Sequence, residues 1–179
     1  MMNRDQFIIK QFKFYHAFEL IDFTYNINKD IEIIKYYKYF WKNKHSVLFM
    51  IIKLVYVLFL SSFNNIGKIL LKRYIIIFIV YYHNKIIGLA HMEFNGRNRY
   101  QDALFGIVLN KEVVGIGLGR KLMQTCIDYC IKNNKRKIEL DVFTDNVRAI
   151  SLYKKIGFTV TNTKNNEYHM ELKLDTLVN

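Results

Sequence analysis

Proline is absent from this chain of 179 residues, and glycine occurs only eight times. These absences exclude collagen-like and proline-rich linker segments, and they leave no evident hinge between two domains. Cysteine occurs only at Cys126 and Cys130, whose spacing of four residues on the apolar face of a predicted helix favours buried, reduced thiols. The first residues also lack the apolar run of a secretion signal. We therefore expect one compact domain over residues 1–179, located in the cytoplasm.

Acidic residues are missing from a long internal stretch. Residues 33–92 contain no Asp or Glu but nine Lys or Arg, within a chain of net charge +12. Such an excess indicates an anionic partner, either nucleic acid, a phosphorylated cofactor or a membrane surface, although a bias toward residues with A/T-rich codons also favours lysine. The chain shows no aromatic and basic sheet motif of the RNA-binding kind, so we expect no nucleic-acid partner.

The acid-free stretch contains one long apolar run. Residues 47–63 are almost wholly apolar, interrupted by Lys53 and a serine pair, and they are at the short limit for crossing a bilayer. Three interpretations remain open: a helix packed within the protein, a basic helix on a membrane surface, and a spanning helix penalised by its central lysine. We expect an apolar, basic insertion at about residues 46–72, with membrane-surface contact through residues 47–73.

Hydrophobic periodicity predicts an α/β protein with a mixed sheet and helices on its faces. Helices are expected over residues 18–25, over 31–44, from Leu118 to an end at Asn133–Asn134, and from a cap at Asp145 or Thr144 to Gly157. Strands are expected at residues 6–14, at 73–94 with a turn at His83–Asn84, at 103–109, at 137–143, and in a final hairpin over 159–174.

A glycine cluster, V-G-I-G-L-G-R at residues 114–120, joins a predicted strand to a predicted helix. Glycines at this junction let backbone N–H groups turn toward an anion, and the helix N-terminus adds positive charge, so the cluster predicts a phosphate site. A dinucleotide-binding loop is disfavoured because the third glycine of G-x-G-x-x-G would have to be Arg120. A purely structural glycine turn is the other alternative.

The second constellation lies at residues 141–158. Asn146 follows a predicted strand at the mouth of a helix, where its side-chain amide can donate and accept hydrogen bonds. Tyr153, seven residues on, projects from the same face, and its phenol is protonated at neutral pH and can supply a proton to a leaving group. The alternative is a half-buried tyrosine that only packs.

The two motifs in this order, V-G-I-G-L-G-R-K-L and L-D-V-x-x-x-N-x-x-A-x-x-L-Y-x-x-x-G-F, resemble the Gcn5-related N-acetyltransferases (GNAT). The resemblance is strong from about Ile86 to Phe158, whereas residues 46–72 have no clear counterpart. It implies a GNAT-type mixed, mostly antiparallel sheet with helices on both faces, and acetyl-CoA as the acetyl donor. It also implies cofactor-binding residues, which are Leu109, Val114, Gly115, Gly117, Gly119, Arg120, Asn146 and Tyr153.

The resemblance assigns separate roles to these residues. Backbone N–H groups of the three glycines and Arg120 would hold the pyrophosphate. The main chain at Leu109 would align the pantetheine arm and polarise the thioester, and Asn146 would hydrogen-bond the cofactor. Tyr153 would protonate the leaving thiolate. Val114 is a departure, because the family usually has Arg or Gln there, and without that side-chain contact cofactor binding should weaken but persist.

The proton acceptor for the amine is less defined. Glu93 and Glu112 are the candidates, alongside a water chain. The five histidines have no metal-binding spacing on one helix, so we expect no metal.

The sequence thus favours an N-acetyltransferase that joins acetyl-CoA and a primary amine in a ternary complex. The amine could belong to a protein N-terminus, a lysine or a small molecule. The alternative is a non-catalytic acyl-CoA-binding or membrane-associated adapter with the same fold.

Overall fold

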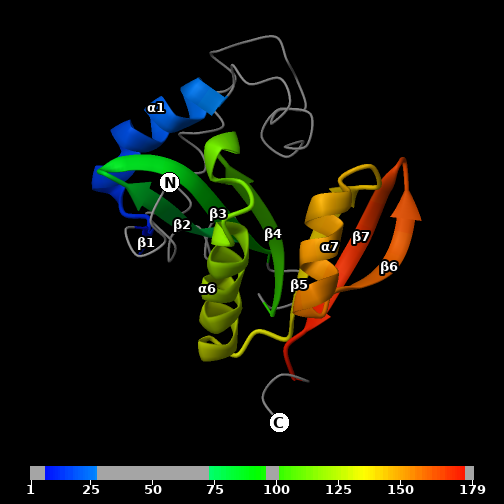
Figure 1. The fold of residues 1–179 in the computed structure, drawn as a ribbon. Helices are drawn as coiled ribbons and strands as arrows, with labels where there is room; N and C mark the ends of the chain where they lie inside the picture. Colours follow the sequence, from blue (N-terminus) through cyan, green and yellow to red (C-terminus); the bar gives the residue numbers. More distant parts are fainter. Residues whose placement is uncertain (1–6, 28–72, 96–100, 176–179) are drawn as a thin grey trace.

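The computed structural model describes residues 7–27, 73–95 and 101–175 (Figure 1). Its seven strands form one sheet, in the order β1-β2-β3-β4-β5-β7-β6. The strands are β1 (Ile8–Gln11), β2 (Arg73–Tyr82), β3 (Lys85–Asn95), β4 (Asp102–Leu109), β5 (Lys137–Phe143), β6 (Thr159–Lys164) and β7 (Glu167–Lys173). Within the described residues, the α-helices are α1 (Ala17–Ile27), α6 (Leu118–Lys132) and α7 (Val147–Ile156).

The sheet is mixed and mostly antiparallel, as predicted. The pairs β1–β2, β2–β3, β3–β4, β5–β7 and β6–β7 are antiparallel, whereas β4 and β5 are parallel. Two hairpins turn on asparagine-containing pairs with positive φ at both residues, His83–Asn84 and Asn165–Asn166. Positive φ at both central residues is typical of the two-residue turn that matches strand twist. These local signals therefore fix the hairpins.

Helices cover both faces of the sheet. Alternate residues of β3, including Ala90, Met92 and Phe94, face α6 and share its core cluster, whereas Leu89 belongs to a second cluster that includes Leu20 of α1. Alternation of this kind follows from the two-residue period of a strand. Figure 1 shows α6 in front of the β2–β4 half of the sheet and α7 in front of the β5–β7 half. The predicted arrangement of helices is confirmed.

The two halves of the sheet separate where β4 meets β5. Their pairing covers only Asp102–Leu104 with Lys137–Glu139. Beyond Leu104, β4 continues in register with β3, and β5 continues in register with β7. The two parallel strands thus share one end and do not pair with each other at their C-terminal ends, which leaves backbone groups of both strands available at the opening.

Some predicted features differ from the structure, and others lie outside the described residues. The first strand is shorter than residues 6–14, because a 3-10 turn already begins at Phe14. Neither Asp145 nor Thr144 caps α7, since Asn146 takes that position. The predicted helix over 31–44, the apolar run 47–63 and the insertion 46–72 lie outside the described residues. Within the described ranges, no helix has the length and apolar character that crossing a membrane requires.

Candidate active site

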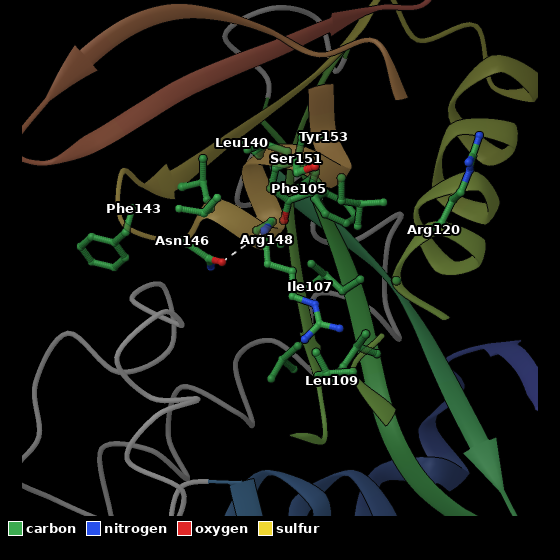
Figure 2. A pocket seen from close by; sticks show the side chains of 18 of the residues that line it. Phe105, Ile107, Leu109, Arg120, Leu140, Phe143, Asn146, Arg148, Ser151 and Tyr153 are labelled. Atoms are coloured by element: carbon green, nitrogen blue, oxygen red, sulfur yellow. Dashed lines mark hydrogen bonds between the residues drawn. The ribbon is translucent and has the colours of Figure 1, made fainter. Parts of the chain in front are cut away.

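A cleft of about 1490 Å³ opens where β4 and β5 separate. Its walls come from β4, the glycine loop, the start of α6, the C-terminal part of β5, and α7. In Figure 2, Tyr153 and Phe105 lie toward one end of the cleft and Leu109 lies toward the other. Apolar side chains of β4 and β5, such as Ile107 and Leu140, line the region between them. The cleft can hold an extended ligand with an apolar section.

The glycine loop forms an open anion cradle at one side of the cleft. Gly115 and Gly117 have φ of 102° and 87°, which favour glycine because a Cβ is strained there. Gly117 is the N-cap of the fifteen-residue helix α6, with no side-chain cap. An added Cβ at Gly117 would meet nothing within 4 Å. Because Gly117, Gly119 and Arg120 line the cleft and no side chain caps α6, the first N–H groups of this helix can bind an anion there, as the sequence motif predicts.

Asn146 is fixed by its capping role in α7. Its Oδ1 accepts a hydrogen bond from the backbone N–H of Ala149 at 3.2 Å. This N-cap interaction orients the side chain and leaves the Nδ2 amide group to donate. Asn146 lines the cleft and is partly exposed. Oδ1 thus accepts a hydrogen bond within α7, and Nδ2 is the group that Asn146 can offer to a ligand in the cleft.

Tyr153 lies in the cleft wall on α7, and only 7% of it is exposed. Its ring packs at a tilt against Phe158, with the ring centroids 5.7 Å apart. Burial raises the pKa of Tyr153 above its ordinary value of about 10, because the phenolate would lose its solvation. The hydroxyl is therefore protonated throughout the neutral range and can act as a hydrogen-bond donor.

Both basic and acidic residues line the cleft. The guanidinium of Arg148 lies close to the glycine loop, as shown by the collision that a Cβ added to Gly115 would have with it. Three carboxylates come from β5, the loop after it, and the start of β7, and these are Asp141, Asp145 and Glu167. The other basic residues of the lining are Lys111, Arg120 and Lys155. The cleft thus offers cations to an anionic ligand and carboxylates to a cationic one.

All eight residues predicted to bind the cofactor line this cleft, although 44 positions separate the first from the last. The two glutamates predicted as proton acceptors do not line it. Glu93 is buried on β3, where burial raises its pKa, and it is in register with Leu104 of β4. Glu112 is exposed in a short 3-10 turn, Lys111–Val113, that precedes the glycine loop.

His91 is a further cleft residue, which the sequence motifs do not include. It is buried on β3 opposite Gly106 of β4, and a Cβ at Gly106 would collide with the imidazole. Burial lowers the pKa of His91 to about 4, so the ring is neutral at physiological pH. The two-residue spacing from Glu93 places both side chains on one face of β3, and this spacing is a signal that the sequence does contain.

Another polar group lies outside the cleft, on the sheet face opposite α7. The side chains of Glu139, His169 and Glu171 converge there, with their metal-ligating atoms within 4.8 Å of one another. Lys137 Nζ lies 2.5 Å from Glu139 and 3.1 Å from Glu171, so one ammonium already pairs with both carboxylates. His169 Nδ1 lies 2.8 Å from Asp141. The residues of this cluster come from two neighbouring strands, β5 and β7. A search of the sequence for histidines spaced along one helix therefore does not find it.

A family model described as the acetyltransferase (GNAT) family matches residues 61–158, more than half of the chain. The chain belongs to this family. Its predicted membership, its class of acyltransferase and acetyl-CoA as its acetyl donor are thereby confirmed.

Solved structures share the fold. One is the spermidine N-acetyltransferase from Vibrio cholerae in complex with CoA and spermine, with a TM-score of 0.70, 21% identity, and coverage of 98% of this chain and 100% of that chain. A GNAT-family acetyltransferase from Streptococcus pneumoniae has a TM-score of 0.64 at 20% identity, covering 94% and 99%. The yncA protein from Salmonella typhimurium, solved with its cofactor acetyl-CoA, has a TM-score of 0.67 at 16% identity, covering 95% of each chain. At these identities the likeness concerns the fold.

Proposed function

We propose that this protein transfers the acetyl group of acetyl-CoA to a primary amine by direct attack in a ternary complex. The observation that carries the proposal is the cleft between β4 and β5, where the open N-terminus of α6 and the hydroxyl-bearing Tyr153 line one continuous space. An anion cradle and a proton donor in one cleft are what transfer from a phosphate-containing thioester requires.

The cleft fits the cofactor by its shape and its donors. Gly115, Gly117, Gly119 and the backbone of Arg120 would hold the pyrophosphate through N–H groups at the start of α6. The part of β4 that does not pair with β5, up to Leu109, would align the pantetheine arm through main-chain hydrogen bonds. Val114 is 38% exposed and apolar, so it would contact the cofactor without contributing a charge.

Acetyl-CoA supplies the thioester carbonyl that the amine attacks. Asn146 would donate from Nδ2 to the cofactor, since its Oδ1 is engaged with Ala149. Tyr153 would hold its proton at Oη and direct it at the sulfur as the thiolate leaves. A pKa raised by burial keeps that proton in place at neutral pH, so a hydrogen bond to the developing charge is the main contribution of Tyr153.

The ammonium form of the amine must lose a proton before attack, and we propose Glu93 rather than Glu112 as its proton acceptor. Glu93 lies on β3 opposite Leu104, which lines the cleft, whereas Glu112 is exposed before the glycine loop. Burial raises the pKa of Glu93 above its ordinary value, which makes the carboxylate a stronger base. A water would have to relay the proton, because Glu93 itself does not line the cleft.

The acceptor is proposed to be a small amine, with polyamines as the first candidates. The Vibrio cholerae structure is that of a spermidine N-acetyltransferase, and three carboxylates line the cleft of the present chain. Asp145 and Glu167 would attract a substrate with several ammonium groups, whereas the carboxylate of Asp141 is paired with His169 outside the cleft. Peptide N-termini and lysine peptides are the competing acceptors.

Calorimetry with acetyl-CoA, followed by release of free thiol in the presence of amines, tests the proposal. We expect saturable binding and thiol release with spermidine or spermine. The panel also contains peptides with free N-termini, lysine peptides and aminoglycosides. Absence of binding at high micromolar acetyl-CoA would refute the cofactor site. Binding without thiol release for every amine would instead favour the non-catalytic adapter.

A further inference from the structure

We propose that Arg148 holds the diphosphate of the bound cofactor and supplies the polar side-chain contact that Val114 cannot make. The inference rests on the proposed acetyl-CoA site and adds a residue to it. It arises from the position of one side chain that crosses from α7 to the glycine loop.

The guanidinium of Arg148 lies directly against Gly115. A Cβ at Gly115 would collide with Nη2 of Arg148 and would lie 3.6 Å from its Cζ. Figure 2 shows the side chain extending from α7 across the cleft, toward Ile107 and Leu109 of β4. Arg148 therefore reaches the loop that is proposed to hold phosphate, although its own backbone belongs to the opposite wall.

The charge of Arg148 is not neutralised within the described parts of the chain. Among residues 7–27, 73–95 and 101–175, no ion pair or hydrogen bond includes its guanidinium. A guanidinium offers five N–H donors in a planar fork that matches two phosphate oxygens. A cation held in a cleft beside free helix N–H groups is suited to an anion that both can share.

The other basic residues of the lining are less suited to this role. In Figure 2 the side chain of Arg120 runs along α6, away from Asn146 and Tyr153. Lys111 and Lys155 also line the cleft, but an ammonium is a point charge without the bidentate geometry of arginine. Arg148 is thus the guanidinium that approaches the glycine loop from the opposite wall.

A contact through Arg148 would join the two halves of the site. The phosphate would be bound by the N-terminus of α6 on one side and by α7 on the other. Because α7 also carries Tyr153 and begins at the cap Asn146, the same contact would fix the position of the proton donor relative to the cofactor. Arg148 therefore acts on binding first and on catalysis through positioning.

Calorimetry with CoA and with 3′-dephospho-CoA tests this assignment. We expect Arg148→Gln to weaken CoA binding about tenfold, as for the loss of a charge-assisted hydrogen bond. The loss should be equal for 3′-dephospho-CoA, because both ligands contain the diphosphate. Arg148→Lys should recover part of the affinity through its point charge. Lys154→Gln, which removes one charge from an exposed position of α7 outside the cleft, should bind like the parent protein.

The outcomes separate this inference from the proposed function. If the parent protein does not bind CoA, the cofactor site itself is refuted. If the parent binds and Arg148→Gln binds equally well, the role of Arg148 is refuted. A loss seen with CoA and absent with 3′-dephospho-CoA would place Arg148 at the 3′-phosphate and would overturn the diphosphate assignment. Thermal unfolding without ligand should show equal midpoints for all variants, because Arg148 is exposed.

Discussion

Tyr153 is the residue on which the proposed chemistry depends most directly. Replacement of Tyr153 by Phe removes the hydroxyl and keeps the ring that packs against Phe158. We expect kcat to fall roughly 10²-fold, the lower range for loss of a positioned proton donor, with little change in the Kd of CoA. Stopped or continuous thiol-release assays and calorimetry measure the two quantities. An unchanged kcat would show that Tyr153 only packs.

The pH dependence of the same residue gives a second expectation. Burial raises the pKa of Tyr153, so its donor form persists as the pH rises through 9 and beyond its ordinary pKa of about 10. Deprotonation of Tyr153 should therefore cause no alkaline loss of kcat below about pH 10. A pH–rate profile of the parent protein and of Tyr153→Phe checks this. An alkaline fall near pH 9 that disappears in the variant would contradict it.

Gly115 and Gly119 differ in their reason for being glycine. Gly115 has a φ of 102° and its added Cβ would collide with Arg148, whereas at Gly119 the nearest side-chain atoms, in Leu152 and Leu109, would lie 3.4 and 3.5 Å away. We expect Gly115→Ala to lower the free energy of unfolding by about 1 kcal/mol or more. Gly119→Ala, within α6, should not lower it. Urea unfolding of both variants measures the contrast, and equal losses would contradict it.

At the scale of elements, the contact between β3 and β4 is built around one missing side chain. His91 and Gly106 are register partners, and a Cβ at Gly106 would enter the space of the imidazole. Gly106→Ala should cost about 2 kcal/mol of unfolding free energy, as for overpacking of a core. In a double-mutant cycle with His91→Ala, the alanine at position 106 should cost much less. Additive losses would show that the imidazole is not what excludes the Cβ.

Local elements of this fold can be predicted from sequence, and non-local ones cannot. The hairpin at His83–Asn84 and the end of α7 at Gly157 follow from residues that favour positive φ. The sequence predicts Asp145 or Thr144 as the cap of α7 because several residue types can cap, and chain geometry decides which one does. The separation of β4 from β5 beyond Leu104 depends on pairing between segments distant in the sequence, and hydrophobic periodicity does not predict such pairing.

The site shows the same division. Gly115, Gly117, Gly119 and Asn146 are identifiable from sequence because each belongs to a short motif with a fixed local geometry. Arg148 lies within the second motif but does not stand out there, since its contact with the glycine loop exists only when α6 and α7 lie on opposite sides of the cleft. His91 belongs to neither motif; its spacing from Glu93 indicates a shared face of β3, but its contact with Gly106 on a neighbouring strand is not predicted from sequence.

At the scale of the whole molecule, the proposed cofactor site accounts for only part of the net charge of +12. Four basic residues line the cleft, which suits a polyanionic cofactor, and three carboxylates line it as well. Most of the acid-free stretch from residue 33 to 92 lies outside the described residues, including nearly all of the segment 47–73 for which the sequence predicts membrane contact. The basic residues that the structure does describe in the cleft suit a phosphate-containing cofactor.

The stability of the whole molecule should depend on pH through His91. Its pKa is about 4 in the folded protein, and about 6.5 when the chain is unfolded. Between these values only the unfolded state takes up the proton, so unfolding becomes easier as the pH falls from about 6.5 to about 4, with a loss of about 3 kcal/mol from this group. Above pH 6.5 the imidazole is neutral in both the folded and the unfolded state, so His91 causes no loss of stability there.

A matched pair of variants isolates this effect. Glu93 has a raised pKa and acts in the opposite direction over part of the same range, but it is common to all the proteins compared and cancels in their difference. We expect His91→Asn to lose less unfolding free energy between pH 7 and pH 4.5 than the parent, by about 2 kcal/mol. His83→Asn, at an exposed hairpin turn, should follow the parent. Urea unfolding at both pH values measures the difference. Equal pH dependence in all three proteins would mean that folding does not lower the pKa of His91, which would contradict a neutral, buried imidazole in the cleft lining.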